Sequence, residues 1–397
     1  MIIEPRTRGF ICTTAHPSGC EQHVLEQMNY VSNHNKIDGP KNVLIIGAST
    51  GYGLASRIVS LGGSNANTIG VFYEKEAKGN RTATAGWYNS AAFEKIAKSM
   101  GVYAKSVNGD AFSNEIKDET LKLIKNDLGK IDLVVYSLAS PRRVDPVTQE
   151  RYMSVLKPIG DSYTNKSIDV MEGIISEITI EPANEEEIMN TTKVMGGEDW
   201  ELWINRLLEE DLLNEGATTI AYSYIGPEVT RPIYRDGTIG LAKVHLENTA
   251  IRLNNTLADI KGKSYVVVAK ALVTQASSAI PVVPLYIAAL YKVMKGKGTH
   301  EGCIEQIYRL FNDSLYGDNK KFDNKGRIRI DDLEMEADVQ SAAIDLFNEV
   351  TTENISSVID LEDYKKEFFR LFGFGFDKVD YNVDVEAVIK IPSLSED

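Results

Sequence analysis

The feature that most constrains the fold is a glycine-rich turn that follows a short apolar segment near the N-terminus. Residues 43–46 (Val-Leu-Ile-Ile) have the β-branched, apolar character of a buried strand. They run directly into Gly47-Ala48-Ser49-Thr50-Gly51-Tyr52-Gly53, and residues 54–61 are compatible with a helix. Glycine tolerates positive φ and lets a backbone approach a phosphate closely, and a helix N-terminus offers free N–H groups. This order of strand, glycine turn and helix predicts the first unit of a dinucleotide-binding fold.

The same alternation of strand and helix continues along the chain. The apolar, β-branched runs predict strands at 43–46, 68–73, 102–107, 133–136, 218–222 and 265–268. Helices are predicted at 54–61, 91–100 and 113–128, the last capped by Ser113. Most of the strand segments are apolar throughout rather than alternating, which is typical of a parallel sheet covered on both faces. The sequence therefore predicts an α/β fold, a Rossmann-type doubly wound parallel sheet.

Two regions lie outside this alternation. Residues 141–216 form a polar, acidic insertion, and the tail 298–397 contains helices and a predicted hairpin around residues 323–326. No Pro/Gly/Ser-rich linker separates autonomous units. We expect one catalytic domain over residues 1–397, with a core at about 40–295 and with the insertion and tail as embellishments.

Composition excludes several kinds of partner. The net charge is −14 over 397 residues, and such a negative field opposes binding to nucleic acids or anionic membranes. The longest nearly apolar run, residues 279–291, holds two prolines and is too short to span a bilayer. Three cysteines are too few for a disulfide framework in a chain of this length, and an odd number cannot all pair. The N-terminus lacks a signal-peptide pattern. We expect a cytoplasmic protein with no nucleic-acid or membrane partner.

An acidic residue follows the second predicted strand and favours one form of the cofactor. Glu74 lies 21 residues after Gly53, where a carboxylate can accept a hydrogen bond from a ribose 2′-hydroxyl and repel a 2′-phosphate. It favours NAD(H) over NADP(H), although the adjacent Lys75 has the opposite preference. Asp110-Ala111 and Ser137-Leu138-Ala139 follow the third and fourth strands, where this fold places adenine and ribose contacts.

Tyr234 and Lys243 are candidates for the chemistry. They are nine positions apart, about 2.5 helical turns, so on one helix they would lie on opposite faces. They can converge only if Tyr234 stands in a loop before a helix, which Asp236 or Thr238 could cap. A phenol can protonate or hydrogen-bond a carbonyl oxygen, and a nearby ammonium is expected to lower the phenol pKa. A chance Tyr/Lys pair with no shared role is an equally good interpretation of the spacing alone.

With these motifs in hand, the chain resembles the trans-2-enoyl-CoA reductase/FabV-type enoyl-ACP reductase family, an enlarged relative of the short-chain dehydrogenase/reductases. The similarity runs nearly end to end, and the Tyr-x8-Lys spacing is its most specific mark. Other landmarks are the GASTGYGLA turn, residues 86–89 (Gly-Trp-Tyr-Asn), 195–200, 221–226 and 300–304.

The resemblance implies hydride transfer from NADH to Cβ of a trans-2-enoyl thioester, carried by CoA (for example crotonyl-CoA) or by acyl carrier protein. It implies Tyr234 as the proton donor and Tyr224 as a substrate contact, with no metal and no flavin. Lys243 would bind NAD(H) together with Gly47, Ala48, Ser49, Thr50, Gly51, Tyr52, Tyr73, Glu74, Asp110, Ala111, Leu138, Ala139, Leu272, Val273 and Thr274. We expect a monomer or a weak homodimer.

Two other functions remain open at this point. A short-chain-type ketone or alcohol dehydrogenase would use the same Tyr/Lys pair with a serine such as Ser137 or Ser223. A non-catalytic NAD(H)-binding module would keep nucleotide binding without turnover.

Several other polar residues have structural interpretations that we prefer. Cys12, His16, Cys20 and His23 could supply zinc ligands, but their spacing favours a packed N-terminal cap. His245 is expected to be structural. Arg142, Arg143 and the lysines at 292, 295 and 297 could meet substrate phosphates, but a solvated surface is the expected role.

Overall fold

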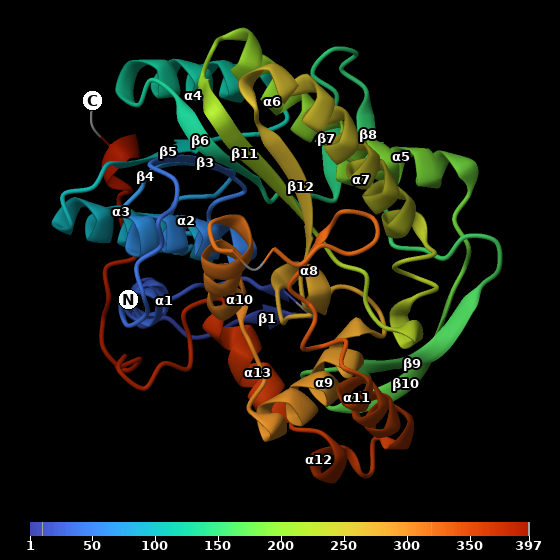
Figure 1. The fold of residues 1–397 in the computed structure, drawn as a ribbon. Coiled ribbons are helices and arrows are strands. Elements are labelled where there is room, and N and C mark those ends of the chain that lie inside the picture. The colour runs from blue at the N-terminus through green and yellow to red at the C-terminus, as the bar shows by residue number, and fades with distance from the viewer. Residues whose placement is uncertain (10, 319, 396–397) are drawn as a thin grey trace.

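The computed structural model describes residues 1–9, 11–318 and 320–395. Its centre is a seven-stranded sheet in the order β13-β12-β11-β6-β3-β4-β5, in which every neighbouring pair is parallel (Figure 1). The strands are β3 (Asn42–Ile46), β4 (Asn67–Phe72), β5 (Ala104–Asn108), β6 (Ile131–Tyr136), β11 (Leu213–Ser223), β12 (Lys263–Val268) and β13 (Ile328–Arg329). The six predicted strands and the α/β class are confirmed.

Helices cover both faces of the sheet, which explains why its strands are apolar throughout. Along β3, Val43 and Ile45 belong to one buried cluster, and Leu44 and Ile46 belong to the other. In Figure 1, helices α4, α6 and α7 lie on one side of the sheet and α1, α2 and α3 on the other. The first group is α4 (Asn114–Asp127), α6 (Glu198–Glu209) and α7 (Thr238–Thr256), and the second is α1 (Pro17–Ser32), α2 (Gly51–Ser64) and α3 (Ala85–Ser99).

The predicted helices are present, with shifted boundaries. The glycine turn is shorter than expected because α2 already begins at Gly51, and α3 begins six residues before the predicted 91–100. Helix α4 is capped as predicted, since the Ser113 hydroxyl accepts from the Ile116 N–H at 3.2 Å.

The insertion 141–216 contributes to the core as well as to the surface. It contains the hairpin strands β7 (Arg142–Val144), β8 (Arg151–Met153), β9 (Tyr163–Asp169) and β10 (Ile174–Ile180), and helices α5 (Glu185–Met195) and α6. Trp200 and Trp203 of α6 are fully buried, and the Trp200 indole donates to the Thr219 hydroxyl on β11 at 2.8 Å. Helix α6 therefore packs against the sheet and completes one of its covered faces. The polar composition of the insertion gave no indication of this buried helix.

The C-terminal region wraps around the face that carries α1. Its predicted turn is present, because the Gly326 N–H bonds to the Asp323 carbonyl and Phe322 pairs with Ile328. Ile328 also belongs to the edge strand β13, which sequence analysis missed because it has only two residues. The remaining elements are α8 (Gln275–Ser278), α9 (Val283–Lys297), α10 (Cys303–Arg309), α11 (Ala337–Glu349), α12 (Ile355–Val358), α13 (Leu361–Arg370), the small hairpin β1 (Thr7–Arg8) and β2 (Ile11–Cys12), the π-helix η3 (Leu310–Leu315), and the short 3₁₀ turns η1 (Glu228–Thr230), η2 (Ala258–Ile260) and η4 (Pro392–Leu394).

The two chain ends meet at the start of α1. The His16 Nδ1 accepts from the Gly19 N–H at 3.2 Å and caps this helix, while the His16 ring meets Tyr381 at a centroid distance of 4.9 Å. This agrees with the predicted packed N-terminal cap.

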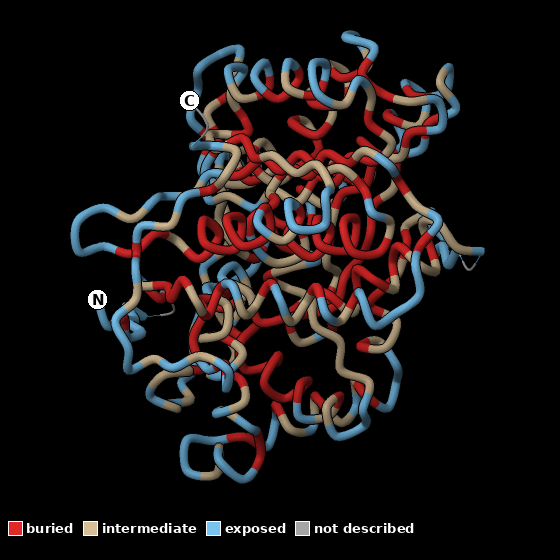
Figure 2. The backbone as a smooth tube through the Cα atoms, turned by 90° about the vertical axis from the view of Figure 1, so that its left-hand side faces the viewer, coloured by how far each residue is buried: buried red, intermediate tan, exposed pale blue. Residues whose placement is uncertain are grey.

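Figure 2 shows that the backbone is buried in the centre of the molecule and exposed at the outer loops and turns. Among the described helices, none is long and apolar enough to cross a membrane.

Gly19 lies so close to the C-terminal region that no side chain fits at this position. A Cβ at Gly19 would overlap the backbone carbonyl of Gly373. We expect Gly19→Ala to lower the free energy of unfolding by about 1–3 kcal/mol, because backbone must move to admit the methyl group. Chemical denaturation measures the change. The matched control is Gly296→Ala in α9, where nothing lies within 4 Å and the added helix propensity should leave stability equal or higher by up to ~1 kcal/mol. Equal effects of the two substitutions would contradict this account.

Candidate active site

The parallel sheet brings the carboxyl ends of its strands to one edge, and the glycine turn lies there. Gly47 has φ +89°, which only glycine adopts without strain, and a Cβ at Gly53 would overlap the Gly47 carbonyl oxygen. Thr50 is the N-cap of α2, but its side chain makes no capping hydrogen bond. Thr50 therefore leaves the first N–H groups of α2 uncapped, which fits a cradle for a pyrophosphate.

Glu74 lies beside this turn, as predicted for a ribose contact. Its Oε1 accepts from the Ser49 hydroxyl at 2.6 Å, and burial raises the pKa of the carboxyl. The preceding Tyr73 is 72% exposed, so its ring is free to lie over a bound group. Both residues follow β4, and Glu74 contacts the glycine turn through Ser49.

The loops after β5 and β6 continue the same edge. The Ala111 carbonyl accepts from the Lys117 ammonium at 2.9 Å and from the Trp203 indole at 3.2 Å. Lys117 is also paired with Asp199 at 2.7 Å, and both side chains are buried. After β6, Leu138 is half-buried and Ala139 exposed, and the Ser137 carbonyl is the atom that a Cβ at Gly47 would strike. Buried contacts therefore fix the backbone of both predicted contact loops.

The loop after β12 is held from several sides. Ala269 N–H bonds to the Ser223 carbonyl at 2.8 Å, and the Tyr52 hydroxyl donates to the Lys270 carbonyl at 2.9 Å. Leu272 and Val273 are buried, and Thr274 caps α8 through its hydroxyl. Tyr52 thus links the glycine turn to the loop that carries Leu272, Val273 and Thr274.

Tyr234 stands in the loop before α7, the position that convergence with Lys243 requires. Its ring meets that of Tyr224 edge-on at a centroid distance of 5.0 Å. Lys243, on α7, donates from Nζ to the Tyr222 carbonyl at 3.1 Å. Both Tyr234 and Lys243 therefore lie at the carboxyl end of β11, which ends at Ser223.

Two expectations about this pair are wrong. Burial alone raises the pKa of Tyr234 to about 12, so the expected lowering by Lys243 does not occur. Burial also lowers the pKa of Lys243 to about 8. The N-cap of α7 is Gly237, without a side-chain cap, because Asp236 pairs with Arg231 at 2.8 Å and the Thr238 hydroxyl donates to the Val155 carbonyl.

Sequence analysis missed Glu334, which lies in the turn between β13 and α11. This carboxylate is fully buried and accepts from the Tyr224 hydroxyl at 3.2 Å, the Tyr286 hydroxyl at 2.8 Å and the Ala271 N–H at 2.7 Å. No local motif marks it, since its partners come from three segments distant in sequence.

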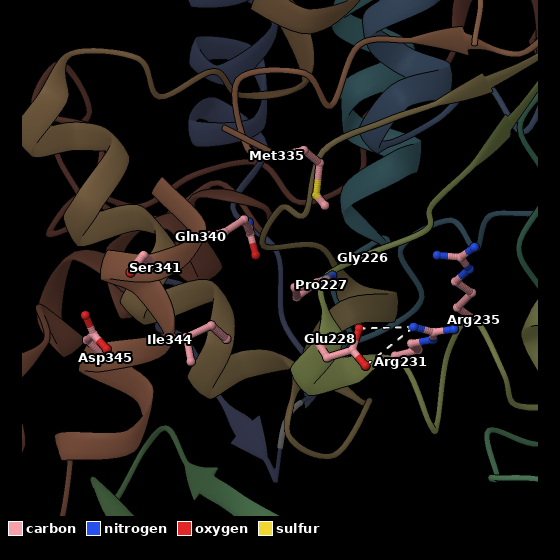
Figure 3. A pocket seen from close by; sticks show the side chains of 10 residues that line it. All are labelled: Gly226, Pro227, Glu228, Arg231, Arg235, Met335, Gln340, Ser341, Ile344 and Asp345. Carbon is pink, nitrogen blue, oxygen red and sulfur yellow. Dashed lines mark hydrogen bonds and ion pairs between the residues drawn. The ribbon is translucent and has the colours of Figure 1, made fainter. Parts of the chain in front are cut away.

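A cleft of about 420 Å³ lies between the loop after β11 and helix α11 (Figure 3). Its lining includes Gly226 and Arg235, which follow Tyr224 and Tyr234 closely in the sequence. In Figure 3, the Arg231 side chain meets Glu228, whereas Arg235 extends away from both. The lining thus mixes apolar, basic and acidic side chains, since Glu228 and Asp345 line the cleft as well. The lining includes Gly226, Pro227, Arg231, Arg235, Met335 and Ile344.

Most of the other candidate polar residues have structural partners. His245 Nδ1 accepts from the Gly197 N–H at 3.0 Å, which confirms a structural role. The solvated role expected for Arg143 is wrong, because its side chain is buried and pairs with Glu198 at 2.6 Å. Lys295 pairs with Asp363 and Glu367, and Lys297 with Asp338.

Fold and site together define a dinucleotide-binding α/β reductase, and comparison with known proteins gives the family. The pattern described as trans-2-enoyl-CoA reductase catalytic region matches residues 81–316, and the one described as NAD(P)H binding domain of trans-2-enoyl-CoA reductase matches residues 2–79. The chain belongs to the trans-2-enoyl-CoA reductase family.

Close relatives cover almost the whole chain. It is 58% identical to a trans-2-enoyl-CoA reductase [NADH] of Ruminiclostridium cellulolyticum and 62% identical to an enoyl-[acyl-carrier-protein] reductase [NADH] of Flavobacterium johnsoniae; each alignment spans 99% of this chain and 100% of the relative. The structure of Clostridium acetobutylicum trans-2-enoyl-CoA reductase in complex with NADH superposes with a TM-score of 0.96 at 48% identity, over 98% of this chain and 100% of that one. The Treponema denticola enzyme with NAD gives 0.94 at 49% identity, with the same coverage.

A third pattern, described as enoyl reductase FAD binding domain, matches residues 322–385, and these residues do not fit a flavin dinucleotide. The segment contains the two-residue strand β13 and three helices, with no strand–glycine turn–helix cradle in its described part. Its buried carboxylates are already satisfied, Asp331 by Arg329 and Glu334 by three donors, and such carboxylates would repel a pyrophosphate. These residues therefore serve the fold and the neighbouring loops rather than a flavin.

The pair Lys117–Asp199 offers a test of how the Ala111 loop is held. We expect Lys117→Met to lower the free energy of unfolding by about 3–5 kcal/mol, because it leaves a buried carboxylate without its cation. Replacing both residues, Lys117→Met with Asp199→Leu, should restore most of the loss. The control Lys125→Met, in the same helix, removes an exposed pair with Glu210 and should cost less than ~1 kcal/mol. Equal losses in Lys117→Met and Lys125→Met, measured by chemical denaturation, would contradict the role of the buried pair.

Proposed function

We propose that this protein is an NADH-dependent reductase that reduces the trans-2 double bond of an enoyl thioester. The observation that carries the proposal is the juxtaposition of Tyr234 with Tyr224 at the carboxyl end of β11, where Lys243 also reaches the backbone. The glycine turn, Glu74 and the NADH named in the relatives support the choice of cofactor.

The proposed reaction depends on charge that develops on the thioester oxygen. NADH, when bound, supplies the hydride that goes to Cβ. Tyr234, whose pKa is raised to about 12, stays protonated at neutral pH and can donate a hydrogen bond to the oxygen as it becomes enolate-like. Protonation of Cα then completes the saturated thioester.

The remaining residues would bind and orient the cofactor. Backbone N–H groups of residues 49–52 would meet the pyrophosphate at the start of α2, since the Ala48 N–H already donates to the Val71 carbonyl at 3.0 Å. Glu74 would accept from the adenosine ribose. Lys243 would hold the nicotinamide ribose through its ammonium. Tyr73, Asp110, Ala111, Leu138, Ala139, Leu272, Val273 and Thr274 would line the rest of the cofactor site, as the resemblance implies.

Carbonyl reduction is the less supported alternative. It would call for a serine hydroxyl next to Tyr234, whereas in the described chain a second phenol, Tyr224, contacts it. The relatives carry names for both CoA and acyl-carrier-protein substrates at similar identity, so the proposal is made for the thioester and includes both carriers.

We extend the proposal to organisation and location. One catalytic domain over residues 1–397 is supported by a single buried cluster that includes both Ile3 and Ile391. We also propose a cytoplasmic protein, which the three free cysteines support, and one free of nucleic-acid and membrane partners, which the charge of −14 supports. A monomer or weak homodimer is part of the same proposal.

The direct test is NADH oxidation with crotonyl-CoA beside a panel of ketones. Turnover of crotonyl-CoA is expected, and turnover of ketones alone would favour the dehydrogenase. Tyr234→Phe should lower kcat by roughly 10²–10³ while NADH binding is kept, because it removes a hydrogen bond made to developing charge. Full activity of this variant would exclude the proposed role of Tyr234.

The lowered pKa of Lys243 predicts a pH dependence of cofactor binding. The ammonium is present below about pH 8 and is lost as pH rises, so NADH should bind more weakly with increasing pH. We expect the Kd for NADH to rise about tenfold between pH 7 and pH 9.5, measured by fluorescence titration. Lys243→Met should bind weakly at every pH with a flat profile. A flat profile in the unmodified protein would contradict the role of this ammonium.

A further inference from the structure

Glu334 is a buried ionisable residue that the proposed mechanism does not use. It comes from the C-terminal region, outside the predicted core, yet its side chain is 0% exposed. Its turn is held rigidly, since the Met335 N–H bonds to the Asp331 carbonyl at 3.0 Å and the Gln340 amide donates to the Glu334 carbonyl at 2.7 Å. A buried carboxylate is costly unless it is satisfied, so its partners indicate what it does.

The two oxygens of Glu334 serve two parts of the site. Oε2 accepts from the Ala271 N–H, one residue before the Leu272–Thr274 segment proposed to bind the cofactor. Oε1 accepts from the hydroxyl of Tyr224, whose ring lies against Tyr234. One carboxylate therefore holds the cofactor loop and the substrate tyrosine at a fixed separation.

This contact also distinguishes the two neighbouring phenols. The single proton of the Tyr224 hydroxyl points to Glu334, so this hydroxyl offers only lone pairs to other groups. Burial and the Glu334 charge both keep the pKa of Tyr224 well above its usual value, so its proton stays in place. Tyr234 has no such carboxylate among its described contacts, and its proton is available to a substrate oxygen.

We propose that Glu334 is a positioning residue that fastens the 271–274 loop and Tyr224 to one carboxylate, so that Tyr224 keeps its proton and Tyr234 serves the thioester oxygen. The inference rests on the proposed function for its substrate and goes beyond it by assigning a role to the C-terminal region. Glu334 acts through its neighbours and does not itself touch the reacting atoms.

Glu334→Gln tests both halves of the proposal. A glutamine cannot accept from both sides: either its NH₂ group faces the Ala271 N–H, or the amide turns over and Tyr224 must accept instead of donate. We expect kcat with crotonyl-CoA to fall 10- to 100-fold and the Kd for NADH to rise at least threefold. Tyr286→Phe is the matched control, because it removes the other phenol from Oε1 and leaves the Ala271 and Tyr224 contacts; both parameters should stay within threefold of the unmodified protein.

A double-substitution cycle separates positioning from general damage. In a Tyr224→Phe background, Glu334→Gln should lower kcat less than threefold, because the contact through which Glu334 acts is already gone. The same loss in both backgrounds would overturn the role through Tyr224. An unchanged Kd for NADH in Glu334→Gln would overturn the role at Ala271.

Two further arrangements keep the result interpretable. If Glu334→Gln does not fold, Glu334→Asp keeps the charge but shortens the side chain by one carbon, and a normal kcat and Kd in that variant would overturn the proposal. If the unmodified protein does not reduce crotonyl-CoA, the proposed function fails, whereas the NADH titrations of Glu334→Gln and Tyr286→Phe still decide the Ala271 half.

Discussion

A parallel sheet buried on both faces determines where this protein can do chemistry. Each strand must be apolar on both sides, so the polar groups that bind or react are displaced to the strand ends. Parallel pairing then brings the carboxyl ends of β3, β4, β5, β6, β11 and β12 to a common edge. The glycine turn, Glu74, the Ala111 loop, Tyr234 and the 269–274 loop all lie on that edge, although they are spread over more than 220 residues of sequence.

Burial is the dominant electrostatic influence on the groups at this edge. It raises the pKa of Tyr234 to about 12 and lowers that of Lys243 to about 8, in both cases without help from a neighbouring charge. Burial thus opposes charge on each group: Tyr234 keeps its proton at neutral pH, whereas Lys243 remains an ammonium below about pH 8. A phenol that keeps its proton suits a hydrogen-bond donor to an enolate-like oxygen better than the ionised phenol that proximity to an ammonium would produce.

The insertion 141–216 and the C-terminal region both supply buried side chains that hold the loops of the site. Helix α6 of the insertion supplies Asp199, which pairs with Lys117 beneath the Ala111 carbonyl. The C-terminal region supplies Glu334, which connects Tyr224 with the Ala271 backbone. Both are buried carboxylates that reach the cofactor loops from outside the predicted core, so the catalytic edge depends on segments that a minimal dinucleotide-binding fold lacks.

The sequence alone determined the α/β class, six of the seven strands of the central sheet and the glycine turn, because each depends on short-range patterns of apolar residues and glycine. It made a loop position of Tyr234 the condition for its convergence with Lys243, and the tertiary structure decided that position. The sequence could not supply the two-residue strand β13, the burial of α6, the pairing of Arg143 or the position of Glu334. The sequence also could not predict the pKa of Tyr234, because the spacing indicates Lys243 as a neighbour but does not indicate how deeply the phenol is buried. These properties arise only when distant segments meet, and a carboxylate or a cation has no local pattern that tells whether water or protein will surround it.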